Sequence, residues 1–176
     1  MAKTSKKQIE KDEKKVISLL QDNARATIED MTEKLGFSRQ KVWRIIKRLE
    51  ENKTIWGYST VVNDDKLDRK RYIMLIKKSI KPLDELADKI VSFTMQKEVK
   101  KIGVQIEYSM FLHGEYDWMF IFLASNMKDV KRFTDVLTKQ YERVISDIKV
   151  LENVFSVQKN GIVNPDIHEF KEFFVQ

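Results

Sequence analysis

The stretch FSRQKVWRIIKRLEENKTIWGYS, Phe37–Ser59, decides the fold of the N-terminal part of the chain. From Arg39 to Arg48 it holds five basic residues and no acidic one. At 100° per residue, four apolar side chains gather on one side of a helix and the cations lie around the rest. The apolar positions are Val42, Ile45, Ile46 and Leu49. This pattern predicts a helix that packs through one face and presents positive charge on the other.

Two shorter amphipathic patterns precede this helix, at residues 6–21 and about 28–35. Thr27 and Ser38 are placed to cap the second and third helices, since their hydroxyls can accept from free backbone N–H groups. Three helices, with a glycine turn before a basic one, indicate a helix-turn-helix. The segment TIWGYSTVV, 54–62, follows as a predicted short β segment, which makes the domain winged-helix-like.

The excess positive charge is confined to the N-terminal part. Residues 1–71 carry 18 Lys and Arg against 12 Asp and Glu, whereas residues 72–176 carry 15 of each. A basic half joined to a neutral half indicates a polyanion-binding domain attached to a domain with another role. We therefore predict a DNA-binding domain over 1–60 and a polar linker over 61–71.

The composition bounds the class of protein. The 176 residues fit one large domain or two small ones, and the chain has no cysteine, which excludes disulfides and cysteine zinc sites. Its longest apolar run, Trp118–Ala124, is far shorter than the ~20 residues that span a bilayer, and the N-terminus lacks the apolar stretch of a secretory signal. We expect a cytoplasmic, nucleoid-associated protein with no membrane partner, no metal and no cofactor.

From Tyr72 the apolar pattern changes to strict alternation. Strands are predicted at 72–76, 102–113, 118–124 and about 148–158. Pro82 opens one predicted helix. A second helix carries an apolar face made by Val130, Phe133, Leu137 and Tyr141. The order βαββαβ is ferredoxin-like, so we predict an α+β fold with this domain over 72–158 and a helical tail over 159–176.

The first and third strands, expected at the centre of this sheet, are apolar on both faces. The two helices can cover only one face, so we expect a second copy of the chain to cover the other and predict a two-fold homodimer. The alternative is that the C-terminal tail covers it. That tail has Ile167, Phe170 and Phe174 at helical spacing, and we expect it to dock onto its own dimer rather than onto another regulator.

These features together resemble the Lrp/AsnC (leucine-responsive, feast/famine) family of transcriptional regulators. The resemblance runs from about Ile9 to Val157 and rests on the helix-turn-helix, the LEEN and IWGY segments after it, and FLHGEYDWMF. Two departures are that Lys53 stands where relatives usually have glycine, so Asn52 or Lys53 must take the left-handed turn, and that the chain continues past the fourth strand. The resemblance implies a sequence-specific DNA-binding regulator that forms dimers or higher oligomers and responds to a small effector such as an amino acid.

The third helix of such a domain enters the major groove, where Arg can pair with guanine and Gln with adenine. We assign base reading to Arg39, Gln40 and Arg44. Phosphate contacts are assigned to Thr27, Ser38 and Lys47. The full predicted DNA-binding set is Thr27, Ser38, Arg39, Gln40, Lys41, Trp43, Arg44, Lys47 and Arg48.

The three tryptophans each allow a plain packing interpretation. For Trp43, a groove contact competes with packing against the first helix or the β segment, and we favour packing. Trp56 and Trp118 are expected in the core or in an interface.

The resemblance also implies an effector site at the hairpin after the second strand. The residues concerned are His113, Gly114, Glu115, Tyr116 and Asp117. In this interpretation the Asp117 carboxylate meets the α-amino group of the effector. The alternative is a simple tight turn in which Gly114 supplies a positive φ.

Two other functions stay open at this point. A chromatin-like architectural protein would bind DNA broadly and need no effector. A tetrapyrrole decarboxylase-like enzyme is known on the same two-domain layout, and His113 is the residue that would support it. The basic third helix argues against the enzyme, and no triad, phosphate loop or paired-histidine motif is visible, so we predict no catalytic residue.

Overall fold

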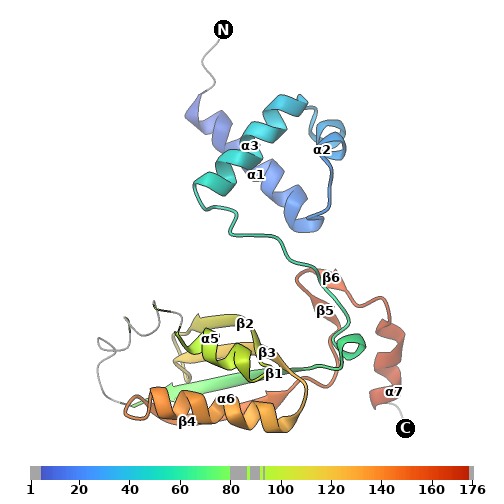
Figure 1. The fold of residues 1–176 in the computed structure, drawn as a ribbon. Helices are drawn as coiled ribbons and strands as arrows, with labels where there is room; N and C mark the ends of the chain where they lie inside the picture. Colours follow the sequence, from blue (N-terminus) through green and yellow to red (C-terminus); the bar gives the residue numbers. More distant parts are fainter. Residues whose placement is uncertain (1–4, 80–86, 88–91, 93, 175–176) are drawn as a thin grey trace. The chain divides into compact units, whose positions relative to one another are not determined.

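The computed structural model describes residues 5–79, 87, 92 and 94–174. The chain forms two compact units, and the boundary in the connection between them falls after Val61. The first unit holds three helices, α1 (Lys6–Asp22), α2 (Ile28–Leu35) and α3 (Arg39–Glu51) (Figure 1). The predicted helix-turn-helix order is thereby confirmed.

Side-chain caps define where these helices begin. The Thr27 hydroxyl accepts from the N–H of Asp30, whose carboxylate accepts from the N–H of Thr27, which completes a capping box. Ser38 accepts from the N–H of Lys41. Gly36 ends α2 with φ 66°, a left-handed conformation that glycine adopts without a Cβ clash. Both predicted caps are confirmed.

The core of the first unit joins all three helices. Its buried residues are Val16, Met31, Val42, Ile45 and Leu49. Ile46, the remaining member of the predicted apolar stripe of α3, is partly buried against them. Burial of this stripe fixes which side of α3 faces outward.

The segment after α3 differs from the prediction. Residues 52–69 are fully described and contain no strand, so the predicted β segment at 54–62 does not form. An isolated extended segment has no partner for its ladder hydrogen bonds, and the β-prone composition of the segment is not enough on its own. Trp56 is 96% exposed there, which makes the predicted core or interface position wrong for the core. Lys53 takes the left-handed turn, with φ 60°.

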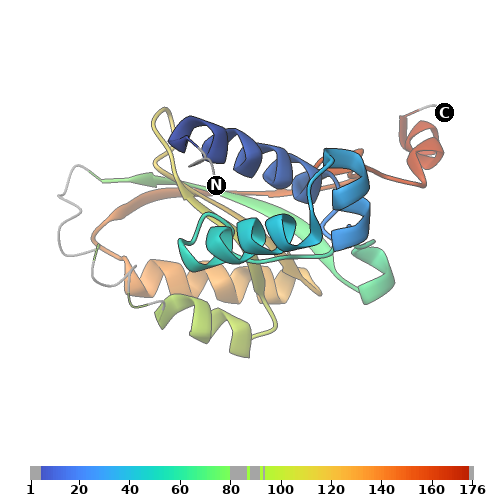
Figure 2. The same cartoon turned by 90° about the horizontal axis from the view of Figure 1, so that it is seen from above.

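The second unit is built on a four-stranded antiparallel sheet. Its strands are β1 (Lys70–Lys78), β2 (Gln105–Phe111), β3 (Trp118–Ala124) and β4 (Ile145–Glu152). Their order is β2-β3-β1-β4, so the first and third strands are central, as predicted. The helices α5 (Thr94–Lys101) and α6 (Met127–Gln140) lie side by side on one face of the sheet (Figure 2). The predicted α+β fold is confirmed, although the Pro82 helix falls outside the described residues.

The two faces of this sheet differ in cover. Alternate residues of the central strands, such as Met74 and Phe120, are fully buried against the helices. The predicted α6 stripe is buried with them: Val130, Phe133, Leu137 and Tyr141. Four intervening residues of β1 and β3 point to the opposite face and are only partly buried, whereas Leu123 on the same side is 3% exposed: the four are Ile73, Leu75, Met119 and Ile121. We call this side the open face of the sheet.

The C-terminal segment is not simply helical. It forms a short hairpin of β5 (Gln158–Lys159) and β6 (Ile162–Val163), followed by a 3₁₀ turn and α7 (Phe170–Phe174) (Figure 1). Asn160 and Gly161 connect the hairpin with φ 48° and 82°, values that an Asn-Gly pair tolerates in a two-residue turn. The predicted fourth strand over 148–158 is therefore divided into β4, an irregular segment and β5.

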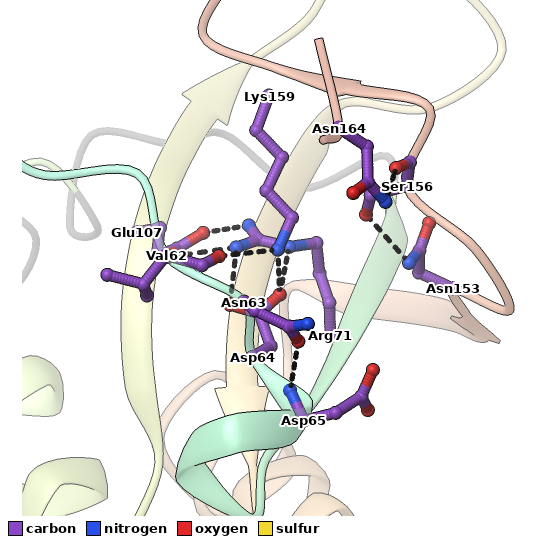
Figure 3. A network of polar contacts seen from close by, with 10 residues as sticks. All are labelled: Val62, Asn63, Asp64, Asp65, Arg71, Glu107, Asn153, Ser156, Lys159 and Asn164. Atoms are coloured by element: carbon purple, nitrogen blue, oxygen red, sulfur yellow. Dashed lines mark hydrogen bonds and ion pairs between the residues drawn. The ribbon is translucent and has the colours of Figure 1, made fainter. Parts of the chain in front are cut away.

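A buried charge cluster attaches both ends of the second unit to its sheet (Figure 3). Arg71 of β1 bonds Asp64 through Nε at 3.0 Å and also pairs with Glu107 of β2. Lys159 of the C-terminal hairpin lies 2.6 Å from the Asp64 carboxylate, and its Nζ also donates to the backbone carbonyl of Val62. Most of the predicted linker, 61–71, therefore belongs to the second unit.

Candidate nucleic-acid interface and effector pocket

The outward side of α3 carries a row of exposed side chains. Gln40, Trp43, Arg44 and Lys47 stand at positions i, i+3, i+4 and i+7, which align along one side of a helix. All four are exposed, opposite the buried apolar stripe. We call these four residues the exposed stripe. It combines an indole with an amide and two cations, and amides and cations are groups that read base edges in the major groove.

Two of the predicted DNA-binding cations form ion pairs with α1. Lys41 Nζ lies 2.7 Å from Asp12, and Arg48 Nε lies 2.7 Å from Glu13. Asp12 is 3% exposed, and the hydrogen bond from Lys41 is the main cause that lowers its pKa. These two cations bind α3 to α1, a role that the sequence analysis did not assign to them.

Other ion pairs of α3 lie in solvent. Arg39 pairs with Glu29 at 2.6 Å, with the two side chains 72% and 57% exposed. Lys47 pairs with Glu51 at 3.8 Å along the same helix. Exposed pairs of this kind contribute only about 0–1 kcal/mol, so their cations can exchange a carboxylate for a phosphate at little cost.

Trp43 and Trp118 have opposite environments. Trp43 is 53% exposed and Lys47 Nζ lies 5.0 Å from the centroid of its ring, so the favoured packing interpretation is wrong for this residue. Trp118 is 4% exposed in the sheet core and donates from Nε1 to Ser109 at 3.0 Å, which confirms its predicted core position.

The hairpin between β2 and β3 holds the second predicted site. The Asp117 carboxylate accepts from the N–H of Lys78 at 2.8 Å, and its own N–H donates to the Ile76 carbonyl at 2.9 Å. These bonds dock the hairpin onto the end of β1. The glycine of the hairpin has no positive φ, so a turn that requires one at Gly114 is not what forms here.

Two lysines surround the hairpin aromatic ring. The Nζ atoms of Lys77 and Lys149 lie 5.1 and 5.7 Å from the ring centroid of Tyr116. Lys77 also pairs with Glu115 at 3.0 Å and lowers the pKa of that carboxyl. A hydrogen bond with the Tyr116 hydroxyl raises the pKa of Lys149.

A pocket of about 340 Å³ opens beside this hairpin. It is lined by Ile76, Lys78, Phe111, Leu112, Asp117, Trp118, Tyr141, Val144 and Ile145. Of the five residues predicted for the effector, only Asp117 lines it. The apolar walls could not be predicted from the sequence because they come from four separate segments. Trp118 could have been predicted as a lining residue, since it directly follows Asp117 in the sequence.

Two further properties concern the described part of the chain only. No helix in it is long and apolar enough to cross a membrane. No group of three or more His, Cys, Asp or Glu side chains gathers in it in a way that could hold a metal ion.

Comparison with known proteins bears on both units. Residues 13–55 match the family of winged helix-turn-helix DNA-binding domains. Over 167 residues, which are 92% of this chain and 89% of the relative, the sequence is 25% identical to YugG, an HTH-type transcriptional regulator of Bacillus subtilis.

Two solved structures share the fold over most of the chain. An AsnC family transcriptional regulator from Agrobacterium tumefaciens has a TM-score of 0.64 at 16% identity, with 88% of this chain and 95% of that one covered. A transcriptional regulator from Neisseria meningitidis, solved as a complex with L-Met, has a TM-score of 0.62 at 18% identity, with 89% and 94% covered.

The class of the protein follows from the basic third helix and these matches: it is a DNA-binding transcriptional regulator with a helix-turn-helix. Its fold is that of the Lrp/AsnC regulators, and the predicted resemblance to that family is confirmed. The relatives are regulators rather than enzymes, which agrees with the prediction of no catalytic residue.

Proposed function

We propose that the protein binds specific DNA sequences as a homodimer, through the exposed stripe of α3, and that an amino acid in the hairpin pocket tunes this binding. The observation that carries the proposal is the division of α3 into a buried apolar side and an outward side with Gln40, Arg44 and Lys47. A helix held in this way can lie in the major groove while the rest of its domain contacts the sugar-phosphate backbone of the DNA.

Different parts of the interface are assigned different roles. Gln40, Arg44 and Arg39 are proposed to contact base edges, where Gln suits adenine and Arg suits guanine. Lys47, Thr27 and Ser38 are proposed to contact phosphates, because the two caps lie at the N-termini of α2 and α3, where backbone N–H groups attract anions.

Fluorescence anisotropy with DNA from upstream of the coding region tests sequence reading. A scrambled duplex of equal composition serves as competitor, at two salt concentrations. Arg44→Ala should weaken specific binding by about 1–3 kcal/mol, whereas Arg132→Ala, an exposed arginine of α6, should leave it unchanged. If the scrambled duplex competes equally well, the protein is an architectural DNA binder rather than a sequence-specific regulator.

The dimer is proposed to form through the open face of the sheet. Four partly buried apolar residues of β1 and β3 lie there, and Tyr108 and Leu151 of the outer strands are 38% and 51% exposed. A second copy would remove this apolar area from water, and the two copies of α3 in the dimer would then bind paired half-sites on the DNA. Sedimentation analysis should show a dimer that Ile121→Lys dissociates and Asp135→Lys, on the exposed side of α6, does not.

The effector is proposed to be an amino acid, since the Neisseria meningitidis regulator of the same fold was solved with L-Met. Asp117 supplies a carboxylate for the ammonium group, and the apolar walls suit a large apolar side chain. Titration of the twenty amino acids, followed by Trp118 fluorescence in a Trp43→Phe/Trp56→Phe background, tests this. Asp117→Asn should abolish the response, and absence of any response in the parent would contradict the effector.

A further inference from the structure

We propose that Trp43 recognises the C5-methyl group of a thymine in the major groove. This inference rests on the proposed DNA binding by α3 and adds which base one side chain selects. Trp43 belongs to the exposed stripe, one turn after Gln40 and one turn before Lys47. It therefore stands on the same side of α3 as the polar groups that would meet base edges.

The exposure of Trp43 sets it apart from the other apolar residues of α3. Val42, Ile45 and Leu49 are at most 5% exposed, whereas Trp43 is 53% exposed. An indole presents a larger apolar area than any of those aliphatic side chains. A partner surface that covers Trp43 thus gains an apolar contact that the folded domain itself does not use.

A cation lies over the face of the ring. Lys47 Nζ lies 5.0 Å from the ring centroid of Trp43, within the range of a cation–π contact. The contact holds the indole against the following turn of α3.

The chemistry of the major groove then selects the base. Adenine, guanine and cytosine present hydrogen-bond donors or acceptors there, and only the thymine edge adds a methyl group. The carbon face of the indole, placed against a donor or acceptor, would desolvate that group without replacing its hydrogen bond, which costs free energy. A C5-methyl group instead meets the indole with favourable apolar contact, and 5-methylcytosine carries the same group.

The experiment removes that single methyl group from the DNA. A duplex is first selected from a random pool with the full-length protein, and each thymine is then replaced in turn by deoxyuridine. At one position of each half-site the parent protein should lose about fourfold in affinity, the equivalent of one buried methyl group. Placing 5-methylcytosine at that position should restore the loss in part, whereas unmethylated cytosine should not.

Variants assign the effect to one residue. Trp43→Ala should bind the thymine and deoxyuridine duplexes equally at that position, and Trp43→Phe should keep part of the difference. Trp56→Ala is the matched control, because Trp56 is 96% exposed in the same unit but lies outside α3. It should keep the full fourfold difference.

The outcomes separate this inference from the proposed function. Selective binding that is indifferent to every deoxyuridine overturns the role of Trp43 alone. So does a difference that persists unchanged in Trp43→Ala. Failure to select any preferred duplex overturns both, because sequence reading itself is then absent.

Discussion

The ion pair between Asp12 of α1 and Lys41 of α3 should respond unequally to removal of its two partners. Asp12 is 4% exposed at its side chain and Lys41 is 37% exposed, with 2.7 Å between Oδ2 and Nζ. In Lys41→Met the carboxylate stays buried with Gln8 as its remaining side-chain donor, at 2.8 Å. In Asp12→Asn the ammonium group can turn to solvent. Lys41→Met should therefore lower the free energy of unfolding of the first unit more than Asp12→Asn does.

The magnitudes follow from these surroundings. Leaving one charge of a buried pair without its partner costs about 3–5 kcal/mol, and the bond from Gln8 puts Lys41→Met at about 3 kcal/mol. Asp12→Asn loses a charge-assisted hydrogen bond, worth about 1.5 kcal/mol. As a control, Glu29→Gln breaks the exposed pair with Arg39 and should cost less than about 0.5 kcal/mol.

Low pH should remove the stability that the pair of Asp12 and Lys41 contributes to the first unit. Because Lys41 lowers the pKa of Asp12 in the folded state, the pair stabilises fully above the ordinary Asp value of about 3.9. The contribution is lost as pH falls through the lower folded-state value. The parent should lose this stability in acid, and Asp12→Asn should lose less.

Native-state hydrogen exchange of the amides of Val42 and Ile45 measures the opening free energy of α3 in the full chain. It reports on the first unit without interference from the second. Equal losses in Lys41→Met and Asp12→Asn, or a larger loss in Asp12→Asn, would refute the argument from unequal exposure. So would a Glu29→Gln loss as large as either.

Three other substitutions test the packing and the backbone. Phe133→Ala, at a side chain with no exposure in the sheet core, should cost about 3–5 kcal/mol in denaturant unfolding of the second unit. Lys53→Gly should stabilise the first unit by about 0.5–1 kcal/mol, measured by α3 hydrogen exchange, because φ is 60° there. Gly161→Ala should weaken protection of the C-terminal hairpin by about 1–2 kcal/mol, because φ is 82°; unchanged protection would mean that the turn relaxes.

The correct predictions came from the periodicity of apolar residues within single helices and strands. The stripe of α3 and the stripe of α6 were readable because each repeats within one helix, and both are buried as expected. The alternation over β2 and the apolar residues on both faces of β3 also lie within single elements, so they predicted the sheet and its central strands. Local patterns of this kind need no knowledge of what packs against them.

Pairings between distant residues were not readable. Nothing in the sequence near Lys41 signals that Asp12, a full helix away, would hold it. The pocket combines Asp117 with Tyr141, which meet only once the sheet and α6 are assembled. The C-terminal hairpin is a different case, because the Asn160-Gly161 pair is a local turn signal that the analysis passed over.

The charge cluster around Asp64 determines where this protein can be cut and rejoined. Asp64 is 6% exposed and is held by Arg71 from within the sheet and by Lys159 from the C-terminal hairpin. A chimera that takes its DNA-binding half from another regulator should therefore be joined upstream of Val62, within 53–61. A junction at residue 71 would replace Asp64 along with the exchanged half and leave Lys159 without its carboxylate partner, and a chain shortened before Lys159 would take one of its two cations from the buried Asp64 carboxylate. The modular unit of exchange is thus shorter than the charge distribution of the sequence implies.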